Sequence, residues 1–159
     1  MNLKLKKATQ KDAEELFDLQ VKTFMPLLEK YQDYETSPAN ETLEKTISRI
    51  SYKLGDYYKI IFNNMVAGGI RVMWWEDTTR YKLGPIFITP EFQGKGIAQQ
   101  AMNMVEELYP QATTWELDTI LQEKRNCYLY EKMGYCQGEE RKIINDKMTI
   151  VFYKKHVLN

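Results

Sequence analysis

The residues from Gln93 to Ala98 have the composition of an anion-binding turn at the start of a helix. They read Gln-Gly-Lys-Gly-Ile-Ala and follow an apolar, strand-like run over residues 81–88. The first amides of a helix have no internal partners and lie at the positive end of its dipole. The two glycines carry no Cβ, so a pyrophosphate can approach these amides, and Lys95 adds a cation. The segment therefore predicts a phosphate-binding turn.

Two familiar phosphate-binding loops do not match this segment. A nucleotide P-loop has serine or threonine after its lysine, whereas Lys95 is followed by Gly96. A dinucleotide-binding fingerprint has a third glycine, whereas position 99 is Gln. One structural alternative stays open, in which the glycines serve a tight turn and close helix packing and bind nothing.

The composition argues against several other chemistries. The single histidine, His156, lies near the end of the chain, and no serine stands in a G-x-S-x-G setting, so a serine–histidine triad is disfavoured. The spacing of His156, Cys127 and Cys136 matches no metal-binding motif, so we expect no metal site. The 22 basic and 22 acidic residues cancel, which argues against a nucleic-acid or membrane partner.

The length and the apolar content predict a single domain over residues 1–159 with its own core. Hydrophobic residues make up 43% of the chain, and 159 residues is an ordinary size for one domain. The N-terminus resembles no signal peptide, and no apolar run approaches the roughly 20 residues that cross a bilayer. Two unpaired cysteines fit a reducing compartment, so we expect a cytoplasmic protein.

Hydrophobic periodicity predicts seven strands and four helices in a mixed α/β arrangement. Proline at position 26 is expected to bend or end the first helix. The pair Asn63-Asn64 is expected to form a tight hairpin, because asparagine tolerates positive φ. The expected strands cover residues 3–5, 57–62, 66–75, 81–88, 114–119, 135–143 and 148–153, and the expected helices cover residues 13–28, 43–54, 97–108 and 125–133.

Two segments, in order, resemble the signatures of the GNAT N-acetyltransferase superfamily. Gln93 to Ala98 match its Q/R-x-x-G-x-G/A motif, and Asn126 to Tyr135 are similar to its second signature, a helix that ends in Y-E-K-x-G-F/Y. The resemblance extends over nearly the whole chain. It implies a GNAT-like mixed, mostly antiparallel sheet of about seven strands flanked by about four helices, with acetyl-CoA as cosubstrate.

The resemblance also implies roles for particular residues. The pantetheine arm of acetyl-CoA would pair with the strand that ends at residue 88, and its pyrophosphate would lie on the glycine turn. Tyr130 matches the family's general acid. The family often has an asparagine where this chain has Glu123, and Asn126 is the candidate replacement. The cofactor-binding residues implied in this way are Ile86, Phe87, Ile88, Gln93, Gly94, Lys95, Gly96, Ile97, Ala98 and Asn126.

The amine acceptor must lose a proton, because an alkyl ammonium has a pKa near 10.4. Glu116 and Asp118 follow the expected cofactor helix and are weak candidates for the base. Glu76 and Glu35 are further candidates, and each of the four carboxylates has the alternative of simple solvation. The mixed aromatic and acidic run from Tyr31 to Glu35 is interpreted as a solvated loop, with an amine-binding wall as the alternative.

The function implied by the resemblance is transfer of an acetyl group from acetyl-CoA to a primary amine of a small molecule or peptide. The amine would attack directly in a ternary complex, without a covalent enzyme intermediate. The first alternative is a coenzyme A-binding sensor of the same fold that has lost turnover. A purely structural interaction domain is the second. The sequence does not determine the oligomeric state, and a homodimer is one of the possibilities.

Overall fold

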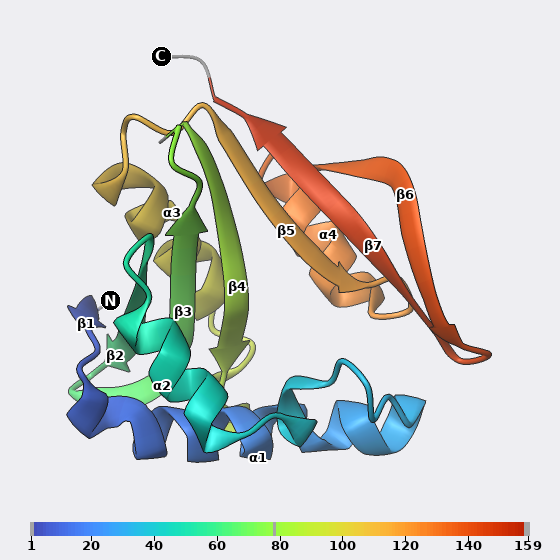
Figure 1. Cartoon of the computed structure of the whole chain (residues 1–159), viewed down its shortest axis with the longest axis horizontal. Helices are drawn as coiled ribbons and strands as arrows, with labels where there is room; N and C mark the ends of the chain where they lie inside the picture. The colour runs from blue at the N-terminus through green and yellow to red at the C-terminus, as the bar shows by residue number, and fades with distance from the viewer. Residues whose placement is uncertain (1, 78, 158–159) are drawn as a thin grey trace.

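A seven-stranded sheet forms the centre of the molecule in the computed structural model, which describes residues 2–77 and 79–157 (Figure 1). Four helices and three short 3-10 turns connect its strands. The strands are β1 (Leu3–Lys7), β2 (Gly55–Phe62), β3 (Met65–Trp74), β4 (Arg80–Ile88), β5 (Thr114–Ile120), β6 (Cys136–Asn145) and β7 (Met148–His156). The helices are α1 (Ala13–Tyr31), α2 (Leu43–Ser51), α3 (Ile97–Leu108) and α4 (Lys124–Lys132), and the 3-10 turns cover Gln10–Asp12, Pro38–Asn40 and Pro90–Phe92.

The strand order is β1-β2-β3-β4-β5-β7-β6, and β4 with β5 is the parallel pair. The other neighbours run antiparallel, and tight hairpins join β2 to β3 and β6 to β7. Asn63 and Asn64 both have positive φ, 50° and 67°, and close the β2–β3 hairpin as predicted. The predicted mixed, mostly antiparallel sheet with four flanking helices is confirmed.

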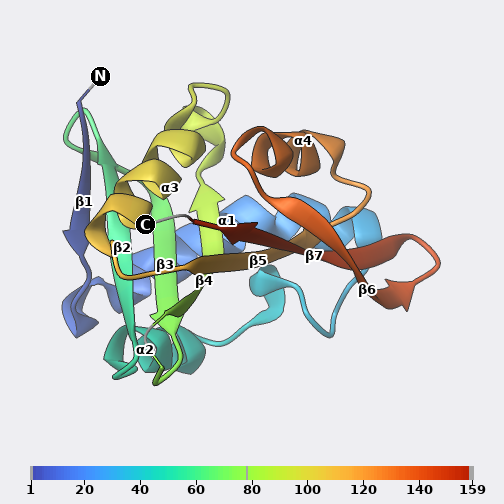
Figure 2. The ribbon, with the colours of Figure 1, turned by 90° about the horizontal axis from the view of Figure 1, so that it is seen from above.

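The helices cover both faces of the sheet (Figure 2). Helices α3 and α4 lie on one face, where Ile97 and Val105 of α3 and Cys127 of α4 join the main core around Trp115. Helices α1 and α2 lie on the other face, where Leu16 of α1 packs into a smaller cluster. The middle of β2 and of β3 is buried without alternation, because each face of the sheet has its own helical cover.

The first helix differs from its prediction at Pro26. It continues through Pro26 and ends only at Tyr31, where Gln32 takes a left-handed conformation with φ 55° and its N–H bonds to Leu28 O. Proline cannot donate to the carbonyl one turn earlier, which disfavours a helix interior. Leu28 and Tyr31 are both buried beyond it, so their packing favours an uninterrupted helix.

Strands β4 and β5 pair over only three residues each and then diverge (Figure 1). Arg80 to Lys82 pair with Thr114 to Glu116, whereas β4 continues to Ile88 and β5 to Ile120. The β3–β4 register also shifts between Ile70 and Val72, opposite the Gly84-Pro85 step. The β5-facing edge of β4 is therefore unpaired beyond Lys82 among the described residues. Among all the described residues, no helix is both long and apolar enough to cross a membrane.

Candidate active site

A cavity of about 500 Å³ opens where β4 and β5 diverge. Its wall includes residues from α1, from the loop over residues 33–41, from β3, β4 and β5, and from α4 and the β6–β7 hairpin. Four of the predicted site residues line it, and they come from three different elements: Ile86, Asp118, Asn126 and Tyr130. The cavity thus joins the α1–α2 face of the sheet to the α4 face through the gap between the strands.

The other predicted site residues lie outside the cavity wall. Phe87 is buried on the α1 side, with its ring 6.1 Å from that of Phe24, and Ile88 pairs with Gly68 of β3. Glu76 borders a separate shallow hollow. The remaining ones are Glu35, Glu116, Gln93, Gly94, Lys95, Gly96, Ile97 and Ala98.

The glycine turn between β4 and α3 has the backbone of an open anion site. Gly94 and Gly96 both have φ of 77°, a left-handed conformation that favours glycine, and Gly96 is the N-cap of α3. A Cβ at either position would meet no atom within 4 Å, so the space above the turn is open. No side chain of the described residues caps the first turn of α3. The Gln93 amide group instead donates to Ile88 O at 2.8 Å, which ties the turn back to β4.

The ring of Tyr130 on α4 packs against two other tyrosines, and its hydroxyl has no hydrogen-bond partner among the described residues. The ring lies 6.3 Å from that of Tyr135 and 6.1 Å from that of Tyr153, edge to face in both cases. Both neighbours donate to glutamates, at 3.2 Å and 2.7 Å, but no described residue bonds to the Tyr130 hydroxyl. Burial, with a contribution from the Asp118 charge, raises the pKa of Tyr130 to about 12. The phenol is therefore protonated at neutral pH and can donate.

Glu123 and Asn126 have different environments at the start of α4. Glu123 is the N-cap residue, and its carboxylate accepts from the Tyr31 hydroxyl at 2.5 Å and from Lys30 at 3.1 Å. Asn126 lines the cavity one turn below Tyr130 and makes no side-chain hydrogen bond to the described residues. Glu123 is therefore used to join α1 to α4, and Asn126 is the residue that can reach a cavity ligand.

The two base candidates on β5 have different environments. Glu116 pairs with Arg80, which holds the pKa of this carboxyl below its usual range, and it lies outside the cavity wall. Asp118 lines the cavity and lies 3.4 Å from Lys82 Nζ. Of the two, Asp118 is the carboxylate that a cavity ligand can meet.

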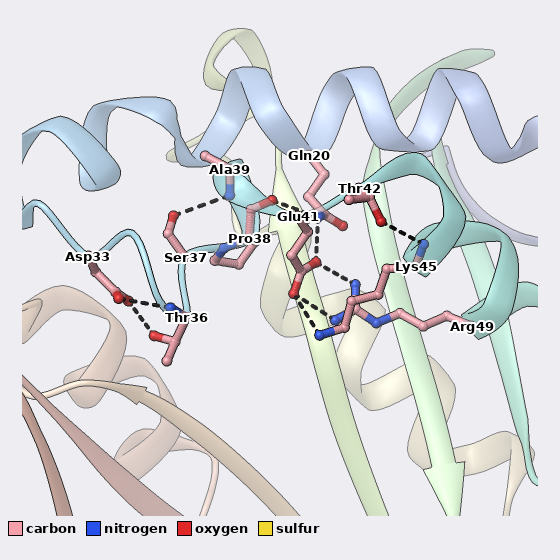
Figure 3. Close-up of polar contacts among 10 residues, drawn as sticks. All are labelled: Gln20, Asp33, Thr36, Ser37, Pro38, Ala39, Glu41, Thr42, Lys45 and Arg49. Carbon is pink, nitrogen blue, oxygen red and sulfur yellow. Dashed lines mark hydrogen bonds and ion pairs between the residues drawn. The ribbon is translucent and has the colours of Figure 1, made fainter.

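The loop between α1 and α2 forms part of the cavity wall. Hydrogen bonds and ion pairs within the loop and to neighbouring helices hold it in place (Figure 3). Glu41 is bound by both terminal nitrogens of Arg49, at 2.7 and 2.9 Å, and by Gln20 at 2.9 Å. Burial raises the pKa of Glu41, but the Arg49 pair outweighs burial and holds it below the usual range. Asp33 accepts from the backbone N–H groups of Glu35 and Thr36. The run from Tyr31 to Glu35 is thus an ordered, partly buried loop.

Sequence reasoning missed Arg71, which lies in the middle of β3 and lines the cavity. The signal was present, because Arg71 is the one charged residue in the otherwise apolar predicted strand over residues 66–75. A half-buried strand tolerates a charge on its solvent face, so periodicity alone gave no reason to single it out. Arg71 is only 9% exposed, and this burial depends on the tertiary structure, which the strand pattern does not predict.

A sequence model of the acetyltransferase (GNAT) family matches residues 13–135, which is more than half of the chain. The chain belongs to the GNAT acetyltransferase family. The matched region includes the glycine turn, the diverging strands and Tyr130. A comparison with curated proteins found no match.

Solved structures with the same fold include several acetyltransferases. A chimera of Vibrio cholerae spermidine N-acetyltransferase SpeG and hSSAT is 16% identical, with a TM-score of 0.77 over 98% of this chain and 96% of that one. A Salmonella typhimurium acetyltransferase that modifies the N-terminal serine of a ribosomal protein is 17% identical, with a TM-score of 0.77 over 99% and 96%. The Thermoplasma acidophilum PaiA N-acetyltransferase, in complex with coenzyme A, is 14% identical, with a TM-score of 0.72 over 99% and 100%. At these identities the likeness shows the fold.

Proposed function

We propose that this protein transfers the acetyl group of acetyl-CoA to a primary amine of a small molecule or peptide, by direct attack in a ternary complex. The observation that carries the proposal is the cavity between the diverging β4 and β5, which the unpartnered Tyr130 hydroxyl borders. Membership of the GNAT family supports the acetyl donor. Neighbours named as spermidine and N-terminal serine acetyltransferases support an amine as acceptor.

The donor would lie along β4 and over the glycine turn. Its pyrophosphate binds the backbone amides from Gly94 to Ala98, where the open space above Gly94 and Gly96 admits it, whereas the Gln93 N–H already donates to Pro90 O. Its pantetheine arm pairs with the unpaired β4 edge at Ile86 to Ile88, as an added strand would. Donor and acceptor thus approach the gap from opposite faces of the sheet.

The reaction needs one proton removed and one supplied. The neutral amine attacks the thioester carbon, a backbone N–H near Phe87 or Ile88 stabilises the developing oxyanion, the new C–N bond forms and the C–S bond breaks. Asp118, directly or through water, accepts the proton that the amine loses. Tyr130 donates its proton to the departing thiolate and regains one from solvent. Asn126 would hold the donor near its thioester end.

Two measurements in sequence test the proposal. Acetyl-CoA at 100 times its Kd should stabilise the fold by about 2.7 kcal/mol in a thermal-shift assay, while ATP and NADH should not. Release of coenzyme A thiol is then followed over a panel of primary amines, with mass spectrometry of the products. Stabilisation with no turnover on any amine would favour the coenzyme A-binding sensor, and no stabilisation would contradict the proposal.

A further inference from the structure

The Arg71 guanidinium is buried in the cavity wall and has no anionic partner within residues 2–77 and 79–157. The residue is 9% exposed, it lies on the α1–α2 side of β3, and its register partner on β2 is Tyr57. Its Nε is fully enclosed and has no hydrogen-bond partner. No carboxylate of the described residues pairs with Arg71, although other arginines and lysines of the protein form ion pairs.

A buried guanidinium without an acceptor costs folding free energy unless a ligand or another group pairs with it. A buried charge requires a paired and hydrogen-bonded partner, and a guanidinium presents five N–H donors. The Tyr52 ring lies 5.4 Å from Arg71 Cζ, and this contact offers a π face but no acceptor for those donors. The Tyr57 hydroxyl, beside Arg71 in the sheet, is also buried without a partner. A cavity-lining arginine is therefore left without an acceptor for its donors among the described residues.

The acidic residues that line the cavity are already engaged. Glu41 is bound by Arg49, Gln20 and Lys45, and Asp33 accepts hydrogen bonds from its own loop (Figure 3). Asp118 lies beside Lys82. Glu41 thereby neutralises Arg49, whose positive charge acts on Arg71. Among the described residues of the cavity wall, Arg71 is the cation without a carboxylate partner, because Lys142 pairs with Glu35 at 3.7 Å.

We propose that the amine acceptor carries a carboxylate and that Arg71 binds it. This inference rests on the proposed acetyl transfer and names the substrate class of the same cavity. A single uncompensated guanidinium matches the single negative charge and the planar, two-oxygen geometry of a carboxylate. A cavity of about 500 Å³ suits an amino-acid-sized ligand. The carboxylate would lie at Arg71 on β3, and the amine would extend across β4 toward Asp118 and Tyr130.

Matched pairs of acceptors test the charge directly. Each pair is an amino acid and its carboxamide, with the same amine and side chain, and phosphoethanolamine and spermidine complete the panel. We expect wild type to favour the acid over the amide by about 10- to 100-fold in kcat/KM, as loss of a charged hydrogen-bonded pair implies. Arg71→Gln should reduce this ratio to near 1 without changing the Kd of acetyl-CoA. Arg71→Lys, which keeps the charge but loses the planar fork, should fall between them.

A distant arginine serves as the control. Arg141→Gln removes the same charge from an exposed position on β6 that does not line the cavity, and it should keep the full preference. Equal turnover of acids and amides by wild type, or an acid preference that survives Arg71→Gln, would overturn the proposal. If phosphoethanolamine is turned over fastest, the anion bound by Arg71 is a phosphate, and the carboxylate proposal is wrong. If spermidine is turned over fastest, the acceptor is not an anion.

A binding measurement separates failure of this inference from failure of acetyl transfer. The Arg71 Nε–H resonance, assigned by its absence in Arg71→Lys, is followed by NMR during titration with N-acetylglycine and with its carboxamide. We expect the acid to shift the resonance and the carboxamide to leave it in place, whether or not any amine is acetylated. Equal effects of the two compounds, or none, would overturn a carboxylate site at Arg71.

Discussion

The Tyr31 hydroxyl donates to the Glu123 carboxylate at 2.5 Å, across 92 residues of sequence. This contact joins the last turn of α1 to the N-cap of α4, so two helices on opposite faces of the sheet are connected at the end of the cavity. Tyr31 is 4% exposed, and burial, together with the Glu123 carboxylate, raises the pKa of its phenol. Glu123 therefore has a structural role at the position where the family often has asparagine.

The Tyr31–Glu123 bond should contribute to stability. Tyr31→Phe is expected to lower the free energy of unfolding by about 1–2 kcal/mol, because a hydrogen bond to a charged group is lost from a mostly buried site. Urea denaturation of Tyr31→Phe, Glu123→Gln and the double variant forms a double-mutant cycle, for which we expect a coupling energy of about 1 kcal/mol. Additive effects of the two substitutions would show that the contact is energetically silent.

Tyr130→Phe should lower kcat with little change in the Kd of acetyl-CoA. The substitution keeps the ring that packs on Tyr135 and Tyr153 and removes the one proton that the hydroxyl supplies, so we expect a loss of about 10²-fold or more. Single-turnover kinetics and donor titration separate the two quantities. Tyr153→Phe is the matched control, because its hydroxyl donates to Glu131 and not to the cavity. An unchanged rate in Tyr130→Phe would remove the tyrosine from the mechanism.

The raised pKa of Tyr130 also has a pH signature. Its pKa of about 12 in the folded state lies above the ordinary tyrosine value of about 10, so the folded state favours the neutral phenol. This residue's contribution to stability is therefore complete below pH 10 and is lost as the pH rises from about 10 to about 12. The difference in unfolding free energy between wild type and Tyr130→Phe should shrink over that range and stay constant between pH 6 and pH 9.

The two β5 carboxylates should respond differently to neutralisation. Asp118→Asn is expected to lower kcat/KM by about 10²-fold, because Asp118 borders the cavity and would accept the proton of the amine. Glu116→Gln breaks the exposed Arg80 pair, lies outside the cavity wall and should leave kcat/KM nearly unchanged. Comparable losses in both variants would indicate an electrostatic effect of β5 in place of a base at Asp118.

Local sequence signals predicted most of the fold. Alternation and helical periodicity located every strand and helix, and Asn63-Asn64 predicted a hairpin by a backbone property that the structure shows. Pro26 was misjudged because its helical context is decided by Leu28 and Tyr31, whose burial depends on distant segments. The local rule for proline gave way to tertiary packing.

The site was less accessible to sequence reasoning. The turn at Gly94 and Gly96 and the tyrosine at 130 come from short motifs, and a motif states residue types but not distances. That Asp118 lines the cavity and Glu116 does not depends on where β5 leaves β4. Arg71 is a candidate binding residue because it is buried and no described carboxylate contacts it. The absence of a partner depends on the tertiary structure, so no sequence pattern predicts it.

The affinity for acetyl-CoA of two variants at Gly96 tests the central claim most directly. Gly96→Glu and Gly96→Gln impose the same left-handed strain and nearly the same volume above the turn, but only glutamate places a negative charge where the pyrophosphate should lie. Isothermal titration should show that Gly96→Glu raises the Kd of acetyl-CoA at least tenfold above that of Gly96→Gln, with both proteins folded by circular dichroism. Equal affinities in the two variants would contradict a donor pyrophosphate bound at the start of α3.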